Sequence, residues 1–382
     1  MKILFVAGGS PATVFALAPL ATAVRNAGHE TFMASIEKIM PFIAGAGLPG
    51  IALNSLTPPD YMHKDRSGAP LEFPTSQREE RRYAGRGFAR LGAASIEPLR
   101  ELARSWRPDL VVGGSLSYAA GLLAAELGVP YVRHAWDPAS TTQMDVGATQ
   151  ELQPELASLG RDTLPEPDLF IDICPESLRP PQAPPAQLMR WIPGNQQRRL
   201  EPWMYAKGER PRVCVTAGSQ AADPYVREKN LQFMRALIRN VAVLDVEVVV
   251  AAPEEIAAEV RSDEVKAGWI PMDVLAPTCD VIMHHGGGVT SMTAMNAGVP
   301  QLIVPHLSHT VSPSRRMAEY GAAIVLMPDE VTADNSAEAC RELLRNPSYR
   351  TRAREIQAEI GALPLPGELV GTLEKLTVGS PA

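Results

Sequence analysis

The residues best suited to chemistry are two adjacent histidines followed by three glycines, residues 284–288. The apolar residues 281–283 before them are typical of a strand buried in a parallel sheet, and residues 290–297 after them form a short helical pattern that ends at Gly298 and Pro300. Glycine lets the backbone turn sharply and approach a ligand, and the free N–H groups of a helix N-terminus attract phosphate. The pattern therefore predicts a strand–turn–helix cradle for a diphosphate.

The alternative is a glycine-rich turn that only connects the strand to the helix. The spacing does not match the GxGxxG dinucleotide fingerprint, and no Lys-Ser/Thr pair follows as in a P-loop. The paired histidines favour the phosphate interpretation, as do Thr290 and Ser291, because hydroxyls in the first helical turn add hydrogen-bond donors where a phosphate oxygen would lie.

A second candidate group is Asp137, which comes directly after a predicted strand at residues 131–134 and before Pro138. The carboxyl ends of parallel strands border the ligand crevice of an open α/β sheet, so a carboxylate in this place points toward a substrate. An aspartate before a proline can equally cap a turn. The sequence leaves both roles open.

The elements that position these residues alternate between strand and helix along both halves of the chain. In the first half, strands are expected at residues 2–7, 31–34, 51–53, 110–113, 131–134 and 169–174, with helices at 11–27, 36–46, 76–106 and 119–127. The second half repeats the alternation, with strands at residues 213–216, 246–251, 281–283, 301–304 and 323–326 and one ending at 268–269, and helices at about 225–241, 253–260, 290–297, 313–320, 336–345, 349–360 and 367–376. This rhythm predicts an α/β fold of two Rossmann-like, doubly wound domains facing across a cleft.

Two proline-rich segments interrupt the rhythm. Residues 54–75 fit no helix or strand period, and we expect a substrate-facing loop there, a flexible insertion being the alternative. Residues 176–211 are expected to connect the domains. The predicted domains are then 1–175 and 212–362, followed at 363–382 by a C-terminal helix that packs back toward the first domain.

Composition excludes several classes of protein. The chain has 382 residues, of which 45% are hydrophobic and 21% charged, which is ordinary for two globular domains. A formal net charge of −7 argues against nucleic-acid and anionic-membrane partners. The four cysteines contain no CxxC pair, so buried thiols in a reducing cytoplasm are expected rather than a metal site. No membrane-spanning run and no signal peptide are expected.

Several short motifs together resemble a known family. They are Gly268-Trp269-Ile270-Pro271, the HGG of residues 285–287 before Thr290, the GVPQ of residues 298–301 and the RRMA of residues 315–318. This set resembles the nucleotide-sugar signature of bacterial natural-product glycosyltransferases of the GT-B fold, family 1. It is most similar to the urdamycin- and landomycin-type olivosyltransferases of angucycline biosynthesis. The resemblance implies an inverting transfer from a dTDP-sugar that needs neither metal nor cofactor, with the acceptor bound by the first domain.

The resemblance also implies the roles of donor-binding residues. Trp269 would flank the nucleobase, a core tryptophan being the alternative, while Ile270 would supply backbone hydrogen bonds and His285 would contact the diphosphate. The residues expected around the donor are Ser219, Trp269, Ile270, His285, Gly287, Gly288, Val289, Thr290, His309 and Thr310.

Two departures from the family pattern are informative. Many relatives place an acidic residue and glutamine where this chain has His309 and Thr310, so we expect a donor with few hydroxyls, such as dTDP-D-olivose. Many relatives also use a histidine base where this chain has Thr13. Asp137 matches the aspartate of the closer relatives instead and is expected to take the phenolic proton. Ser10 would help to bind the acceptor hydroxyl or the sugar.

The acceptor is expected to be a flat aromatic polyketide bound by Pro58, Tyr61, Met62, Leu71, Phe73 and Trp136, with packing of the loop as the alternative role of these side chains. We expect an O-glycoside, the alternative being a C-glycoside on the same kind of acceptor. More distant alternatives are a nucleotide-sugar 2-epimerase and a non-catalytic activator of another glycosyltransferase. A homodimer is one expected assembly.

Overall fold

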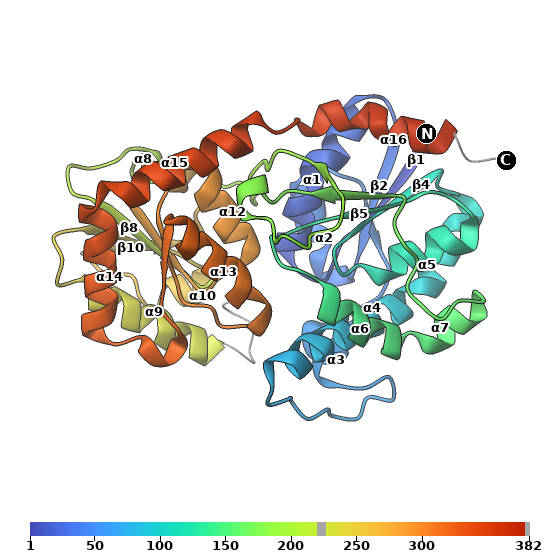
Figure 1. Ribbon diagram of the computed structural model, residues 1–382, viewed down its shortest axis with the longest axis horizontal. Coiled ribbons are helices and arrows are strands. Elements are labelled where there is room, and N and C mark those ends of the chain that lie inside the picture. Colours follow the sequence, from blue (N-terminus) through green and yellow to red (C-terminus); the bar gives the residue numbers. More distant parts are fainter. Residues whose placement is uncertain (220–226, 379–382) are drawn as a thin grey trace. The chain divides into compact units, whose positions relative to one another are not determined.

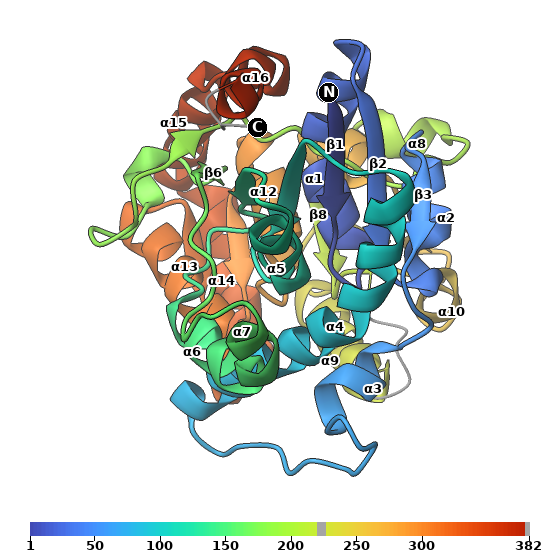
Figure 2. The same ribbon diagram turned by 90° about the vertical axis from the view of Figure 1, so that its right-hand side faces the viewer.

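The computed structural model describes residues 1–219 and 227–378, and the chain divides into two compact units (Figure 1). The first unit consists of Met1–Ile173, Pro181–Arg190 and the residues from Leu363 onwards, and the second consists of Cys174–Pro180 and Trp191–Ala362. Each unit is built on one parallel sheet with helices packed around it, as a second view also shows (Figure 2). The predicted α/β class with two doubly wound sheets is confirmed.

The first sheet has seven strands in the order β3-β2-β1-β4-β5-β6-β7, all of them parallel. Their bounds are β1 Lys2–Val6, β2 Glu30–Ser35, β3 Gly50–Ala52, β4 Leu110–Gly114, β5 Tyr131–His134, β6 Leu169–Asp172 and β7 Gln187–Leu188. The order reverses between β1 and β4. Ligands of open α/β sheets bind beside the strand ends at such a reversal.

Helices of the first unit connect these strands, and the C-terminal helix joins them. They are α1 Pro11–Asn26, α2 Met40–Gly45, α3 Pro58–His63, α4 Gln77–Ser105, α5 Tyr118–Leu127, α6 Thr142–Glu151, α7 Gln153–Ser158 and α16 Val370–Val378, with 3-10 turns η1 Glu37–Ile39 and η5 Pro366–Leu369. Pro11 is suited to the first position of α1, since its missing N–H would have no partner there. The η5 turn packs on α1, and Glu374 of α16 contacts His29 at 3.0 Å.

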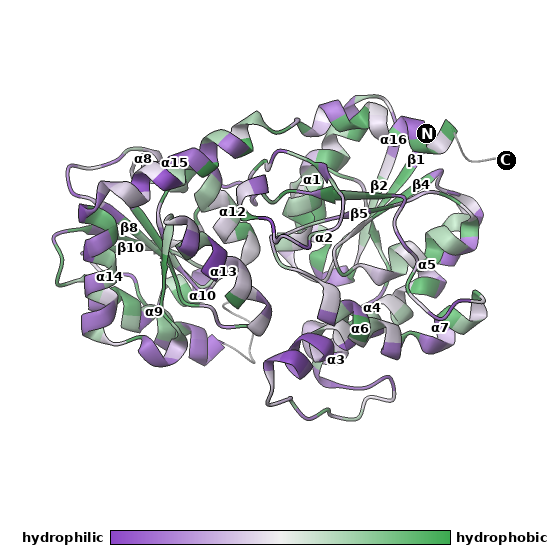
Figure 3. Ribbon diagram, in the orientation of Figure 1, coloured by the Kyte–Doolittle hydropathy of each residue, from purple (hydrophilic) through white to green (hydrophobic). Residues whose placement is uncertain are grey.

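The second sheet has six parallel strands in the order β10-β9-β8-β11-β12-β13. Their bounds are β8 Arg212–Thr216, β9 Glu247–Ala251, β10 Val265–Gly268, β11 Val281–His284, β12 Gln301–Ile303 and β13 Ala323–Val325. Alternate residues of β8 face two separate apolar clusters, one containing Val213 and Val215 and the other Cys214, because successive side chains of a strand point to opposite faces. The strands are accordingly hydrophobic and the outer helices largely hydrophilic (Figure 3).

Helices of the second unit cover both faces of this sheet. They are α8 Pro202–Tyr205, α9 Arg227–Val241, α10 Glu254–Ala257, α11 Met272–Leu275, α12 Gly288–Asn296, α13 Ser308–Tyr320, α14 Ala333–Arg345 and α15 Pro347–Ala362, with 3-10 turns η2 Glu176–Leu178, η3 Ala276–Thr278 and η4 Pro328–Glu330. None of the helices in the described part of the chain combines the length and apolarity needed to cross a membrane.

The structure corrects the expectation of an irregular segment at residues 54–75. This segment contains α3, whose first residue is Pro58. A capping box stabilises the start of the helix, where Thr57 and Asp60 satisfy each other's backbone N–H groups. The sequence TPPD at residues 57–60 is a signal for the start of a helix. A helix of six residues has fewer than two turns, so it is too short to show a helical period. The helices α6 and α7 are likewise absent from the prediction.

The segment 176–211, expected to connect the domains, contributes elements to both units. Its residues 181–190 belong to the first unit, where β7 pairs with β6, and residues 191–211 belong to the second, where α8 packs on α11. The proline-rich segment therefore lies along both units. Proline is tolerated beside β7 because β7 is an edge strand of its sheet.

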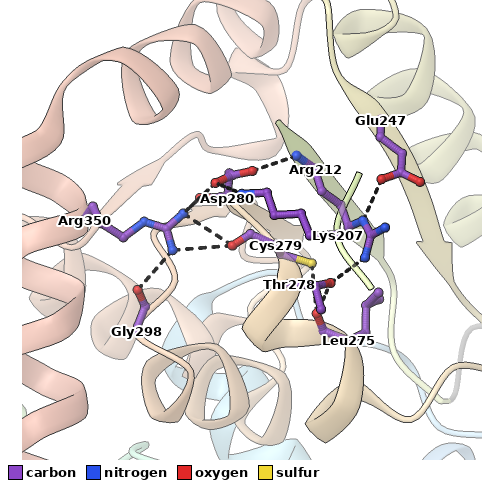
Figure 4. Close-up of polar contacts among 9 residues, drawn as sticks. All are labelled: Lys207, Arg212, Glu247, Leu275, Thr278, Cys279, Asp280, Gly298 and Arg350. Atoms are coloured by element: carbon purple, nitrogen blue, oxygen red, sulfur yellow. Dashed lines mark hydrogen bonds and ion pairs between the residues drawn. The ribbon is translucent and has the colours of Figure 1, made fainter. Parts of the chain in front are cut away.

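A polar network fixes the amino-terminal end of the second sheet (Figure 4). Arg212 is only 1% exposed, and its guanidinium donates to Glu247 at 2.8 Å and to the hydroxyl of Thr278 at 2.6 Å. Asp280 accepts the backbone N–H of Arg212 at 2.8 Å and also contacts Arg350 of α15 at 3.3 Å. These contacts stabilise the end of the sheet opposite the strand ends where a ligand would bind.

Candidate active site

The reversal of strand order in the second sheet lies between β8 and β11. Here the turn after β8, with Gly218 at φ +78°, comes beside the turn after β11, with Gly286 at φ +85°. Both positive φ values are conformations that side chains with a Cβ rarely adopt. Gly286 of the predicted cradle and Gly218, in the turn that contains Ser219, therefore both lie where an open α/β sheet binds its ligand.

The His285 imidazole lies against Gly218 and Gly287. A Cβ on Gly218 would come 2.8 Å from its Cε1 atom, and a Cβ on Gly287 would come 2.7 Å from its Nε2 atom, so only glycine leaves room for the ring. Its Nδ1 atom is buried, and among the described residues no group pairs with it. Burial lowers the pKa of His285 to about 4, although a backbone hydrogen bond at Thr216 opposes the shift. At neutral pH the ring is thus an uncharged hydrogen-bonding group.

His306 is a neighbour of His285 that the sequence reasoning missed. The two ring centroids are 6.3 Å apart, and His306 also packs edge-on against Phe233 at 4.4 Å. Burial, with smaller contributions from its neighbours His285 and Lys229, lowers the pKa of His306 to about 4. Its position shortly after β12, at the carboxyl end of the strand next to β11, could have identified it.

The first turn of α12 supplies the predicted backbone donors. Gly287 is the N-cap, and Gly288, Val289 and Thr290 follow it, all partly exposed. Ser219 is partly exposed in the turn after Gly218, and residues 220–226 beyond it lie outside the described structure. Uncapped N–H groups at the start of a helix provide a binding site for an anion.

The remaining donor residues are less uniformly placed. Trp269 follows β10 at the same edge of the sheet; its indole N–H donates to the Gln196 carbonyl at 3.2 Å, and the Arg198 guanidinium lies 5.7 Å from its ring. The side chain of Ile270 is buried in the core. Thr310 is buried beside Gly286, and its hydroxyl donates to the Leu307 carbonyl at 2.8 Å.

His309 completes the predicted donor set and is partly exposed in the first turn of α13. Neither it nor Thr310 supplies a carboxylate. Among the described residues, no group of three or more His, Cys, Asp or Glu side chains is arranged to hold a metal ion.

The first unit has a cavity at its own reversal of strand order, between β1 and β4. It comprises about 310 Å³ of empty space including the part open to solvent, and the space for a water-sized sphere is only about 20 Å³. The enclosed part therefore corresponds to about one water molecule, and the rest of the recess opens to solvent. Its lining residues are Val6, Ala7, Gly8, Ser35, Ile36, Leu53, Phe88, Leu91, Gly92, Ser95, Leu116, Ser117, Tyr118 and Ala119.

None of the six predicted acceptor residues lines this cavity, but two of them flank it. Tyr61 and Trp136 both pack against Phe88, which lines the cavity, with ring centroids 6.1 and 6.0 Å from it. The Trp136 ring lies against Gly8 and Gly114, where a Cβ would come 3.2 and 2.5 Å from it. Phe88 of α4, which lines the cavity and contacts both rings, is an aromatic residue that sequence reasoning missed.

The other predicted acceptor residues lie on or after α3. Met62 packs against Gly87 of α4, and Pro58 begins α3. Leu71 donates its backbone N–H to the His63 carbonyl at 2.8 Å. Phe73 is 60% exposed, with its ring 5.4 Å from that of Tyr83.

Ser117 is a polar residue of the cavity that the sequence reasoning did not identify. It is 8% exposed and precedes α5 as its N-cap, yet its side chain makes no capping hydrogen bond. Among the described residues, its buried hydroxyl has no hydrogen-bond partner. Because an unpaired buried hydroxyl is costly, a partner supplied by a ligand would be favourable here.

Asp137 is half-buried just beyond β5, and its structure supports both interpretations that the sequence left open. Its Oδ1 atom accepts the backbone N–H of Ala139 at 2.8 Å, which is the turn-capping contact. Burial raises its pKa from 3.8 to about 6; the Ala139 hydrogen bond opposes this, and the charge of Asp172 adds to it. A carboxyl group with such a pKa can accept a proton near neutral pH.

Ser10 and Thr13 lie at the start of α1, at the end of β1. Ser10 is the N-cap and makes no side-chain capping bond. The Thr13 hydroxyl lies 2.9 and 2.7 Å from the carbonyl oxygens of Gly8 and Ser10, which share its one hydrogen. Its hydrogen is thus occupied, and a threonine cannot replace a histidine as a proton acceptor.

Comparison with known proteins gives likenesses over almost the whole chain. Residues 22–218 match the N-terminal domain, and residues 235–376 the C-terminal domain, of the "Erythromycin biosynthesis protein CIII-like" family. The L-demethylnoviosyl transferase of Streptomyces niveus is 32% identical over 371 residues, 96% of each chain. The aclacinomycin-T 2-deoxy-L-fucose transferase of Streptomyces galilaeus is 29% identical, over 99% of this chain and 96% of that one.

A solved structure agrees with these sequence relatives. The glycosyltransferase SsfS6 of Streptomyces sp. SF2575, crystallised with thymidine diphosphate, superposes with a TM-score of 0.87 at 32% identity. The match covers 98% of this chain and 99% of SsfS6.

Proposed function

Because the chain belongs to the erythromycin biosynthesis protein CIII-like family of glycosyltransferases, with the GT-B fold of two Rossmann-like units, we propose that it moves a deoxysugar from dTDP to an aromatic polyketide. The observation that carries the proposal is the uncharged His285 ring held between Gly218 and Gly287, beside the free N–H groups that begin α12. This arrangement is suited to a diphosphate.

The diphosphate is the leaving group of the transfer. Negative charge that develops on it is stabilised by fixed N–H dipoles and by the His285 imidazole, without need of a metal ion. The thymidine diphosphate crystallised with SsfS6 supports dTDP as the nucleotide. We place the ring of Trp269 beside the base.

The sugar of the proposed donor is D-olivose. His309 and Thr310 stand where a carboxylate would accept hydrogen bonds from sugar hydroxyls, and the Thr310 hydroxyl already donates to Leu307. A site without this acceptor is suited to a sugar that lacks hydroxyls. The 2-deoxy-L-fucose named for the relative from Streptomyces galilaeus supports a deoxysugar as the class of donor.

The proposed acceptor is a phenolic position of an angucycline-type aglycone, with one edge in the cavity of the first unit. Asp137 removes the phenolic proton as the oxygen attacks the anomeric carbon; the new C–O bond forms, the bond from that carbon to the diphosphate breaks, and dTDP leaves. Inversion follows from attack on the face opposite the leaving group.

Attack through the ring carbon beside the phenol would instead give a C-glycoside, with the same base. The apolar lining of the cavity is compatible with either orientation of a flat ring. We propose the O-glycoside and retain the C-glycoside as the alternative. The epimerase and activator alternatives are not proposed, because the relatives and the solved structure described above are named as transferases.

The test supplies dTDP-D-olivose and a tetracyclic phenolic aglycone and follows the product by mass spectrometry. A product heavier by one olivosyl group supports the proposal, and its loss of sugar in hot acid distinguishes the O-glycoside from an acid-stable C-glycoside. His285→Ala should abolish dTDP binding. Transfer from other dTDP-deoxysugars but not dTDP-D-olivose would overturn the choice of sugar, and no dTDP binding would overturn the proposal as a whole.

A further inference from the structure

A chain of buried hydrogen bonds leads from the glycine turn after β11 into the sheet. His284 and Gln301 are both fully buried, and neither has a role in the function proposed above. The Nδ1 atom of His284 accepts the backbone N–H of Gly286 at 3.1 Å, and its Nε2 atom lies 2.8 Å from the Gln301 Oε1 atom. The Gln301 amide nitrogen then donates to the carbonyl of Ser291 in α12 at 3.3 Å.

The donors in this chain determine the protonation of the ring. The Gly286 N–H can only donate, so Nδ1 must be the unprotonated nitrogen. The proton is therefore on Nε2 and is donated to Gln301, whose amide can act as donor to Ser291 only in this orientation. Each donor and acceptor of the His284 and Gln301 side chains in this chain of bonds then has a compatible partner. The Nε2–H tautomer of His284 is therefore the stable one.

The atoms held by this chain belong to the proposed diphosphate site. Gly286 has φ +85°, and a Cβ there would lie 3.0 Å from the Thr310 hydroxyl. Ser291 lies in the first turn of α12, where its N–H bonds to the Gly287 carbonyl at 2.9 Å. The turn is thus fixed at its beginning through Gly286 and at its end through Ser291, with His285 and Gly287 between them.

We propose that His284 and Gln301 are a pair of positioning residues that hold the His285 imidazole and the N–H groups of residues 287–289 in the orientation that receives a diphosphate. The proposal rests on the proposed function for the identity of the ligand. His284 acts through the backbone of Gly286 and does not touch the phosphate. It stays uncharged, because an imidazolium would turn a second N–H toward that of Gly286.

Two substitutions of His284 separate its two contacts. In His284→Asn, the amide oxygen can occupy the place of Nδ1 and accept the Gly286 N–H, so dTDP affinity should stay within about 3-fold of wild type. In His284→Gln, the amide reaches toward Gln301 but leaves the Gly286 N–H unpaired, so the affinity should fall by about 10-fold or more. Equal losses in the two variants, measured by calorimetric titration with dTDP on proteins of verified fold, would overturn the proposal.

A third variant gives a pH signature. In Gln301→Glu, a carboxylate facing Nε2 favours the imidazolium, and the other titratable group beside His284 is His285, which disfavours it. The dTDP affinity of Gln301→Glu relative to wild type should therefore decrease as the pH falls from 8 to 6. A ratio that does not change with pH would count against the pair.

The ring itself can be observed without dTDP. Long-range ¹H–¹⁵N correlation spectra of histidine-labelled protein should show His284 as the Nε2–H tautomer, unchanged between pH 5 and 8 and on addition of dTDP. A titrating ring, the Nδ1–H tautomer or a shift that reports direct phosphate contact would overturn the proposal. These spectra test the pair even if dTDP does not bind, which would overturn the proposed function alone.

Discussion

Burial of the Asp137 carboxyl group lowers the stability of the folded chain when the group is ionised, and it also gives the group the raised pKa of the proposed base. Below about pH 3.8 its carboxyl group is protonated in both folded and unfolded chains and has no effect on stability. As the pH rises from about 3.8 to about 6, the unfolded chain releases the proton while the folded chain keeps it, so the free energy of unfolding decreases. Above about pH 6 both chains are ionised, and the cost of burying the charge no longer changes with pH. The shift of about two pK units corresponds to at most roughly 3 kcal/mol, and less for a half-buried side chain.

We therefore expect Asp137→Asn to lose activity and gain stability. An amide oxygen can still accept the Ala139 N–H, but it cannot accept the phenolic proton, so turnover should fall by roughly 10²–10⁴-fold. The melting temperature should exceed that of wild type at pH 8 and equal it at pH 4. In wild type, kcat/KM should decrease as the pH falls below about 6. Full activity in the variant would exclude Asp137 as the base.

Ser117 and Ser95 form a matched pair in the cavity of the first unit. The hydroxyl of Ser95 donates to the Leu91 carbonyl at 2.7 Å and accepts from Asn54 at 3.0 Å, whereas that of Ser117 has no partner among the described residues. Ser117→Ala should leave the melting temperature unchanged or raised and increase the KM of the acceptor by roughly 2–10-fold, the value of one hydrogen bond. Ser95→Ala should lower the melting temperature instead. Acceptor kinetics identical to wild type in Ser117→Ala would place the acceptor elsewhere.

At the scale of elements, α4 and α6 cross in close contact within the first unit. The two helices lie side by side in both views (Figures 1 and 2) and meet at a pair of glycines. A Cβ on Gly85 would lie 1.9 Å from the Met144 carbonyl oxygen, and one on Gly147 would lie 2.1 Å from that of Arg82. Nothing larger than hydrogen fits between these backbones.

This crossing also positions polar groups near Asp137. Asp145 of α6 makes a 2.7 Å ion pair with Arg133 of β5 and accepts the Tyr118 hydroxyl at 3.0 Å. A shift of α6 would therefore move the end of β5, and the predicted base lies just beyond it.

Gly85→Ala or Gly147→Ala should lower the free energy of unfolding by about 2 kcal/mol or more, because the helices must separate to admit the methyl group. Gly45→Ala is the control: Gly45 is exposed in α2 with nothing within 4 Å of its Cβ position, so alanine should be neutral or stabilising by up to about 1 kcal/mol. Urea unfolding of the three variants measures the difference. Equal stabilities would show that α4 and α6 are not in close contact.

At the scale of the whole molecule, the chain consists of two units, each with its own sheet, its own reversal of strand order and its own proposed ligand. A ligand that binds only the folded state stabilises it by about 2.7 kcal/mol at one hundred times its Kd. Saturating dTDP should therefore slow hydrogen exchange in β8 and β11 and leave β1 and β4 unaffected. His285→Ala should remove the effect. Equal protection of both sheets, or protection of the first alone, would contradict the assignment of the nucleotide to the second unit.

The sequence by itself determined the alternation of strands and helices, because buried parallel strands are apolar throughout and glycine and proline mark where elements end. β5 at Tyr131–His134 agrees with the prediction to the residue, and β11 at Val281–His284 differs by one. The position of His285 in a glycine turn could also be predicted, because the conformation of a tight turn depends on the residues within it. Short helices such as α3, which has one capping box and little periodicity, could not.

Only the tertiary structure decided which distant residues meet. Ser117 and Phe88 lie on separate elements, yet both line one cavity, and none of the six acceptor residues chosen from sequence does so. The hydrogen bond from His284 to Gln301 depends on the register of β11 with β12, which no periodicity reveals. Burial likewise raises the pKa of Asp137, since desolvation depends on everything packed around a group and not on its neighbours in the chain.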